Sequence, residues 1–244
     1  LATVTLGRES FGAVVLLQSL MGAATVWCTF QLAKERFGDL AAMIAAVIAA
    51  VYPYYVVHDT ALGETSLFTL LTAVAVLLLK RAVTGSAKWA AWAGAALGLD
   101  VMTRSTIAPF AVFAPFYLLC FGNGPRNRRL ALASYCTLTL LLVVSPWLVR
   151  SYILTGTVRL TTETGFQLWN GNNESTFSHY PQESIDLSTQ VALARITLQE
   201  RTDMERLQVI EQERWYAKRA LTYVREHRWS TMLGGFRKLA AAFG

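Results

Sequence analysis

Long uncharged apolar runs alternate with short polar connections through the first 150 residues. Because an α-helix rises about 1.5 Å per residue, about 20 apolar residues cross the hydrocarbon core of a bilayer. Six stretches meet or approach that length, and they predict transmembrane helices at residues 10–33, 40–57, 65–79, 89–103, 105–121 and 130–149. The pattern therefore predicts an all-α multi-span membrane bundle with about six transmembrane helices.

The pattern changes after residue 150, where the chain becomes polar and rich in charge. β-branched residues followed by Gly and Asn predict a short strand and a tight loop between residues 157 and 175. Residues 188–227 lack Gly and Pro, which favours a solvent-facing helix or helix pair. Its apolar stripe is expected at helical spacing along Ile210, Ala217, Leu221 and Val224.

This change of pattern predicts that the chain is divided into three parts. Residues 1–149 are expected to form the transmembrane bundle, and 150–228 a small mixed, mainly helical extracytoplasmic segment. Residues 229–244 have two bases in mid-course, which is typical of an interfacial helix or the start of a further span. Neither end of the sequence carries a start or stop signal, so we expect an internal piece of a longer protein.

Composition supports a membrane protein and excludes several other classes. Hydrophobic residues make up 54% of the chain and charged residues 16%, whereas soluble domains have about 25% charged residues. The net charge of +6 comes from bases in the connections between apolar runs, so nucleic acid is not an expected partner. Cys28, Cys120 and Cys136 lie inside apolar runs without metal-ligand spacing, and no metal site is predicted.

The connections differ in charge, and this difference predicts their sidedness. Bases occur in alternate connections, and the positive-inside rule assigns such connections to the cytoplasm. These bases are Lys34, Arg36, Lys80, Arg81, Lys88, Arg126, Arg128 and Arg129. The stretch HDTALGE, with His58, Asp59 and Glu64, then faces the outside together with Arg104 and Arg150.

Carboxylates and arginines at one membrane surface favour chemistry on a phosphate-bearing lipid. Arg binds phosphate through a planar, permanently charged fork, and a carboxylate acts as a general base or holds a divalent cation. Structural alternatives exist for these residues. Glu64 could cap the N-terminus of the following helix, and Asp100 precedes Arg104 by four residues, the spacing of a helical ion pair. Gly94 and Gly98 have the GxxxG spacing that permits close helix approach.

Several short motifs in a fixed order resemble a known superfamily. AKERFGD, VYPYYVVHDTALGE, AGAALGLDVMTRST, SPWLVRSYILTG and GFQLWNGNN are similar to the bacterial branch of the GT-C glycosyltransferases. Protein O-mannosyltransferases and lipid A aminoarabinose transferases belong to that branch. The resemblance implies a multi-pass enzyme of the bacterial plasma membrane that takes a sugar from a polyprenyl-phosphate donor on the outer face, with inverting transfer to protein, lipid or glycan.

The resemblance also implies roles for particular residues. Glu64 and Asp59 are candidate catalytic residues, and Arg104 and Arg150 are candidate donor-phosphate ligands. Trp169 and Asn172 are candidate substrate-binding residues; Trp169 could line a sugar site or lie at the headgroup boundary. The best-known acidic site of the superfamily lies in an outer loop that would precede Leu1, and this departure leaves catalysis by the present chain alone open.

Two other functions are compatible with the sequence. A ligase of lipid-linked glycans would use similar groups, but is expected to carry a larger outer domain. A secondary transporter would place charges near the bilayer midplane, whereas here they lie at the ends of apolar runs. The sugar, the acceptor and the cofactor stay open, with a divalent cation as a candidate.

Overall fold

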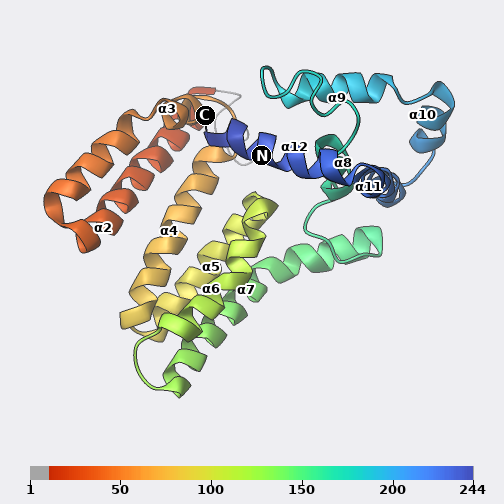
Figure 1. The fold of residues 1–244 in the computed structure, drawn as a ribbon. Coiled ribbons are helices and arrows are strands. Elements are labelled where there is room, and N and C mark those ends of the chain that lie inside the picture. The colour runs from red at the N-terminus through yellow and green to blue at the C-terminus, as the bar shows by residue number, and fades with distance from the viewer. Residues whose placement is uncertain (1–10, 244) are drawn as a thin grey trace. The chain divides into compact units, whose positions relative to one another are not determined.

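The structure, a computed structural model, describes residues 11–243, and within them it contains helices and no strand (Figure 1). The chain divides into two compact units, Leu1–Ser151 and Tyr152–Gly244. The predicted all-α class is confirmed for the described residues. The strand expected between 157 and 175 is wrong, because helix α8 (Thr164–Gly171) occupies part of that region.

The first unit begins with α2 (Phe11–Val51), which consists of two arms joined at Gly38 (Figure 1). Gly38 has a φ of 84°, a conformation that side chains with a Cβ rarely adopt, so the chain reverses there. The arms contain the first two predicted membrane spans. The second arm ends at Val51, earlier than predicted, and α3 (Pro53–Thr60) follows, because Pro53 has no N–H with which to continue the helix.

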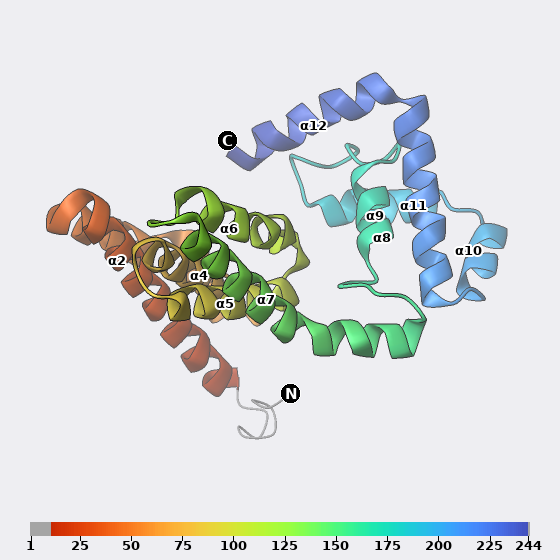
Figure 2. The ribbon, with the colours of Figure 1, turned by 90° about the horizontal axis from the view of Figure 1, so that it is seen from below.

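Four further helices complete this unit: α4 (Thr65–Thr84), α5 (Ala87–Thr103), α6 (Ala108–Phe121) and α7 (Arg126–Thr155), with a short 3-10 helix at Ser105–Ile107. Figure 2 shows α4, α5, α6 and α7 packed together. Among the described helices, α2, α4 and α7 are long and apolar enough to cross a membrane. The count of six crossings stays a prediction, since α5 has 17 residues and α6 has 14.

The basic connections meet at one end of this bundle. The Lys80 ammonium lies 3.1 Å from the Glu35 carboxylate and donates to the carbonyl of Leu32 at 3.2 Å. The Arg128 guanidinium donates to the carbonyls of Thr84 and Gly85. The three connections that the sequence assigns to the cytoplasm are therefore joined to one another by ion pairs and hydrogen bonds.

Helices α5 and α7 approach closely at the two glycines of the GxxxG pair. A Cβ at Gly94 would collide with the backbone carbonyl of Cys136, and a Cβ at Gly98 would lie 2.8 Å from the Val143 side chain. The Thr139 hydroxyl also donates to the carbonyl of Ala91 at 2.8 Å, across the two helices. The close approach that the GxxxG spacing predicts is confirmed.

The second unit contains α8, α9 (Ile185–Ala194), α10 (Leu198–Glu205), α11 (Val209–Glu226) and α12 (Arg228–Phe243). Its core consists of Trp169, Ala192, Ile196, Tyr216 and Ala220, and α8 packs along α11. The predicted stripe on α11 is wrong at Leu221, which is 47% exposed. Its other three residues are partly buried, and Tyr216 and Ala220 are the buried apolar residues that pack in the core with α8 and α9.

Replacement of Gly94 by Val should force α5 and α7 apart. Overpacking of this kind destabilises a folded protein by about 1–3 kcal/mol. In a Cys120→Ser background the remaining thiols, Cys28 and Cys136, are buried, so a thiol-reactive dye reports unfolding in detergent as they become accessible. We expect Gly94→Val to lower the midpoint of that transition, whereas Leu99→Val, on an exposed face of the same helix, should leave it nearly unchanged. Equal midpoints for both variants would contradict the contact.

Acid should loosen α10. The backbone N–H of Thr197, followed by the Arg219 guanidinium, lowers the pKa of Glu200 below its usual value. A lowered pKa means that this stabilisation is present above the ordinary pKa of Glu and is lost as the pH falls through the lowered value. Hydrogen exchange of α10, corrected for intrinsic rates, should accelerate on acidification. Glu200→Gln should accelerate it already at neutral pH, and Glu205→Gln should not.

Candidate functional site

Glu64 and Arg104 form an ion pair at the end of the bundle opposite the basic connections. Their side chains lie 3.2 Å apart, and both are about half exposed. Glu64 directly precedes α4 and Arg104 directly follows α5, so the antiparallel pairing of these two helices brings the residues together. The guanidinium also lies over the Phe68 ring, 5.4 Å from its centroid, which restricts its orientation.

The predicted ion pair between Asp100 and Arg104 is wrong. Arg104 lies beyond the last turn of α5 in an extended conformation, with φ −147° and ψ 112°, so the helical spacing of four residues does not apply to it. Asp100 is fully buried and instead accepts a hydrogen bond from the Thr72 hydroxyl at 2.8 Å. Arg104 is thereby available to Glu64.

Glu64 occupies the N-cap position of α4, as expected if its role were to cap this helix. Its side chain, however, makes no capping hydrogen bond. The carboxylate is directed instead to Arg104. Proximity to the positive end of the helix still stabilises its negative charge.

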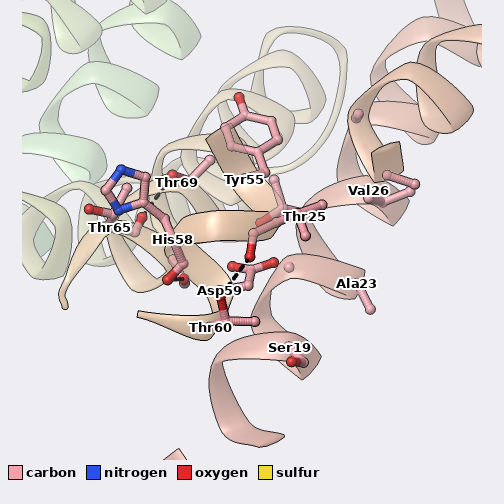
Figure 3. Close-up of a pocket in the computed structure, with 15 residues that line it drawn as sticks. Ser19, Ala23, Thr25, Val26, Tyr55, His58, Asp59, Thr60, Thr65 and Thr69 are labelled. Carbon is pink, nitrogen blue, oxygen red and sulfur yellow. Dashed lines mark hydrogen bonds between the residues drawn. The ribbon is translucent and has the colours of Figure 1, made fainter. Parts of the chain in front are cut away.

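A cavity of about 320 Å³ lies next to this ion pair, between α2, α3 and the start of α4 (Figure 3). This volume is at the lower end of the range for small-molecule sites, roughly 300–1,000 Å³. Figure 3 shows Asp59 from α3 and Thr25 from α2 close together in the cavity, with His58 from α3 and Thr69 from α4 on its lining. Thr65, the neighbour of Glu64 in the chain, also lines it, so cavity and ion pair are adjacent.

Hydrogen bonds hold the connection between α3 and α4 against α2. The Gln18 amide is buried and donates to the carbonyl of Gly63 at 2.8 Å, and the Ser66 hydroxyl donates to the carbonyl of His58 at 3.2 Å. A Cβ at Gly22 would collide with the Asp59 carboxylate, so only Gly leaves space for that side chain. The polar wall of the cavity is thus built by the first arm of α2 and by α3 with its connection to α4.

The contribution of α2 to this wall was not among our predictions, although a signal for it exists. Gln18, Gly22 and Thr25 recur at intervals of four and three residues inside an otherwise apolar run. This spacing places them on one helix face. A polar and small face within a predicted span indicates contact with protein or water rather than lipid.

Arg150 lies near the end of α7, where its guanidinium is 5.2 Å from the centroid of the Trp147 ring. Gly94 faces Cys136 and Gly98 faces Leu140 and Val143, so α5 and α7 run parallel. The last turns of α7 within the first unit are therefore at the same end of the bundle as Arg104. The role of Arg150 as a donor-phosphate ligand stays a prediction.

Trp169 and Asn172 belong to the second unit. Trp169 is 3% exposed and packs against Phe166 and Tyr216, so it is part of the core of that unit. The Asn172 side-chain amide donates to the carbonyl of Leu168 at 2.9 Å. Both residues line a second cavity of about 320 Å³ within this unit. Their role in substrate binding stays a prediction.

No group of three His, Cys, Asp or Glu side chains suitable for a metal ion occurs among residues 11–243. Asp59 and Glu64 are the acidic residues at this end of the bundle in the described part of the chain, together with the buried Asp100. A resident divalent cation would need further ligands beyond Asp59 and Glu64.

An apolar helical bundle with carboxylates, a guanidinium and a cavity with one polar wall at one end has the features of an integral membrane protein with a candidate enzyme site. The sequence comparisons agree with that class. The chain belongs to the dolichyl-phosphate-mannose-protein mannosyltransferase family, whose model matches residues 2–149. It is therefore a membrane glycosyltransferase of the GT-C type. No curated protein and no solved structure matched the chain.

The fit between Gly22 and Asp59 can be tested by a double-mutant cycle. Gly22→Ala should lower the unfolding midpoint, because the added Cβ displaces the Asp59 carboxylate. In Asp59→Ala the same substitution should be tolerated, giving a coupling free energy of about 1–2 kcal/mol. Gly12→Ala, in the same helix with open space around it, is the matched control and should not destabilise the protein. Additive effects of Gly22→Ala and Asp59→Ala would contradict the contact.

Proposed function

We propose that this protein transfers a sugar from a polyprenyl-phosphate donor to an acceptor hydroxyl at the outer face of a bacterial plasma membrane. The cavity beside the Glu64–Arg104 ion pair is the reaction site in this proposal. Family membership supports glycosyl transfer from a lipid-linked sugar. The donor, the orientation and the residue roles are inferred from the arrangement of charges in the first unit.

One observation supports the proposal most directly: the charges lie at opposite ends of α4. Lys80 is near its C-terminal end with the other basic connections, and Glu64 precedes its N-terminus. The 20 residues of α4 span about 30 Å, which is the thickness of the hydrocarbon core. If the basic end is cytoplasmic, as the positive-inside rule requires, then Asp59, Glu64 and Arg104 face the outer surface.

The geometry supports a direct displacement. The Asp59 carboxylate, at the cavity wall, accepts the proton of the acceptor hydroxyl as its oxygen forms a bond to the anomeric carbon of the sugar. The bond from that carbon to the phosphate oxygen breaks, and the electron pair leaves with polyprenyl phosphate. Arg104 stabilises the additional negative charge on the leaving phosphate.

Glu64 has a positioning role in this scheme. Its carboxylate, together with the Phe68 ring, holds the Arg104 guanidinium beside the start of α4, where the adjacent Thr65 lines the cavity. Because the pair is half exposed, a donor phosphate can reach Arg104 without burial of an unpaired charge. Arg150, at the same end of the bundle, is the second candidate ligand for the phosphate.

Transport and glycan ligation are the competing functions. Transport leaves its substrate unchanged and would use charges near the bilayer midplane. In the described bundle, Asp59, Glu64 and Arg104 lie instead at helix ends. A ligase of lipid-linked glycans would use the same cavity with a larger donor, and the identity of the released lipid distinguishes it: a ligase releases a lipid diphosphate.

Turnover of a radiolabelled polyprenyl-phosphate sugar in membranes that contain the protein tests the proposal. Asp59→Asn should reduce the rate of sugar transfer about 10²–10⁴-fold, the usual contribution of general base catalysis. Arg104→Ala should reduce it about 10²–10³-fold, as loss of a charge-stabilising donor does. Glu64→Gln should give a smaller loss, because it disturbs the position of Arg104 but not its charge.

Asp39→Asn is the matched control, since it removes a carboxylate from an ion pair with Lys34 at the basic end of the bundle. It should transfer sugar at the parent rate. Parent-like rates in both Asp59→Asn and Arg104→Ala would rule out the assigned site, and uptake of intact sugar without a released lipid phosphate would rule out the reaction.

A further inference from the structure

Helix α12 exposes the face that a helix of a water-soluble domain would bury. Five large apolar side chains on this helix are between 48% and 75% exposed: Trp229, Met232, Leu233, Phe236 and Leu239. Their spacing of three and four residues places them on one side of the helix. Exposed apolar stripes of this kind mark an interaction site rather than a solvated surface.

The opposite face of α12 is directed toward its own unit and consists of small and polar residues. Gly234 is in contact with the Phe177 ring, which lies 2.8 Å from the position that a Cβ would take. The Lys238 ammonium donates to the carbonyl of Gly171 and lies 5.9 Å from the centroid of the same ring. Arg237 lies over that ring at 5.7 Å. The apolar face is thus left uncovered by the unit to which α12 belongs.

A cavity of about 150 Å³ borders this inward face. Its lining includes the cationic side chains of Arg237 and Lys238 and the hydroxyls of Ser230 and Thr231, and it contains no acidic residue. The Thr231 hydroxyl is buried and has no hydrogen-bond partner among residues 11–243. Burial lowers the pKa of Lys238, which reflects the cost of holding its charge there without an anionic partner. A hydroxyl without a hydrogen-bond partner beside two cations that form no ion pair in the described part of the chain favours a phosphate oxygen as ligand.

We propose that α12 lies in the outer surface of an anionic phospholipid bilayer, with its apolar face among the acyl chains and a lipid phosphate in the cavity lined by Arg237 and Lys238. An interfacial helix has large apolar residues on one face, including Trp at headgroup level, and bases on the other. All charged residues of α12 are basic: Arg228, Arg237 and Lys238. This inference does not depend on the proposed glycosyl transfer.

Two observations favour a bilayer over a protein partner. The unit that contains α12 begins inside α7, a helix long and apolar enough to cross a membrane, so the chain itself tethers this unit to the bilayer. In addition, α12 combines aromatic and aliphatic residues with an excess of positive charge, and the headgroups of anionic lipids complement that charge.

Fluorophores at two positions test the docking of α12. In a Cys120→Ser background, in which Cys28 and Cys136 are buried, a polarity-sensitive dye is attached at Phe236→Cys on the apolar face or at Thr222→Cys on the exposed surface of α11. The protein is placed in nanodiscs of phosphatidylcholine that include a lipid with a nitroxide on its acyl chain. We expect a blue shift and strong quenching at residue 236, and neither at residue 222. Unshifted, unquenched emission at residue 236 would overturn the docking of α12.

Phosphatidylglycerol in the nanodiscs tests the phosphate site. It should increase quenching at residue 236, and Arg237→Gln should reduce the ratio of docked to undocked helix about fivefold, since each base near an anionic surface contributes about 1 kcal/mol. Lys218→Gln, on α11, is the charge-matched control and should retain the increase. Equal loss in both variants would overturn the site. Reversal of the increase by inorganic phosphate at constant ionic strength would show that free phosphate, rather than lipid, occupies the cavity, and would overturn the lipid assignment.

Discussion

Charge cannot be placed in hydrocarbon without a partner, and this constraint organises the first unit. The apolar stretches of its helices carry charge only at their ends, with the exception of Asp100, which is buried against the Thr72 hydroxyl. Charged residues therefore gather in two layers, separated by the length of α4. The layer of Lys80 and Arg128 is cross-linked to the backbone of neighbouring connections. The layer of Glu64 and Arg104 adjoins a cavity with one polar wall and is half exposed, as the proposed reaction site requires.

Close contacts between helices hold the layer of Glu64 and Arg104 in position. Packing between membrane helices depends on small residues and interhelical hydrogen bonds, because lipid is as apolar as the side chains. Gly94 and Gly98 meet α7, and Gly22 makes room for Asp59. The Gln18 amide holds the connection before α4. Small and polar residues inside apolar helices thus position the carboxylates, although none of these residues carries charge.

In the second unit, the last helix differs from the others in exposing its apolar face. Its interior is built around Trp169 and Tyr216 in the manner of a soluble helical domain, and α12 then presents its apolar face outward. A chain that anchors one unit in the bilayer holds the other near the lipid surface, where an exposed apolar stripe is stable. In the proposed arrangement, the apolar face of α12 and the spans of the first unit both contact lipid.

The sequence alone determined the helical class, the apolar segments and the alternation of basic connections, because hydropathy and charge are properties of local stretches. The carboxylates and guanidinium at one end of the bundle also followed from sidedness. Only the tertiary structure decided which charges pair. Arg104 lies one residue beyond a helix end, so it meets Glu64, 40 positions away, rather than Asp100. It also decided that α2 supplies a wall of the cavity, that Trp169 is buried, and which face of α11 and α12 is inside. Such outcomes depend on the packing of helices distant in sequence, which local periodicity does not specify.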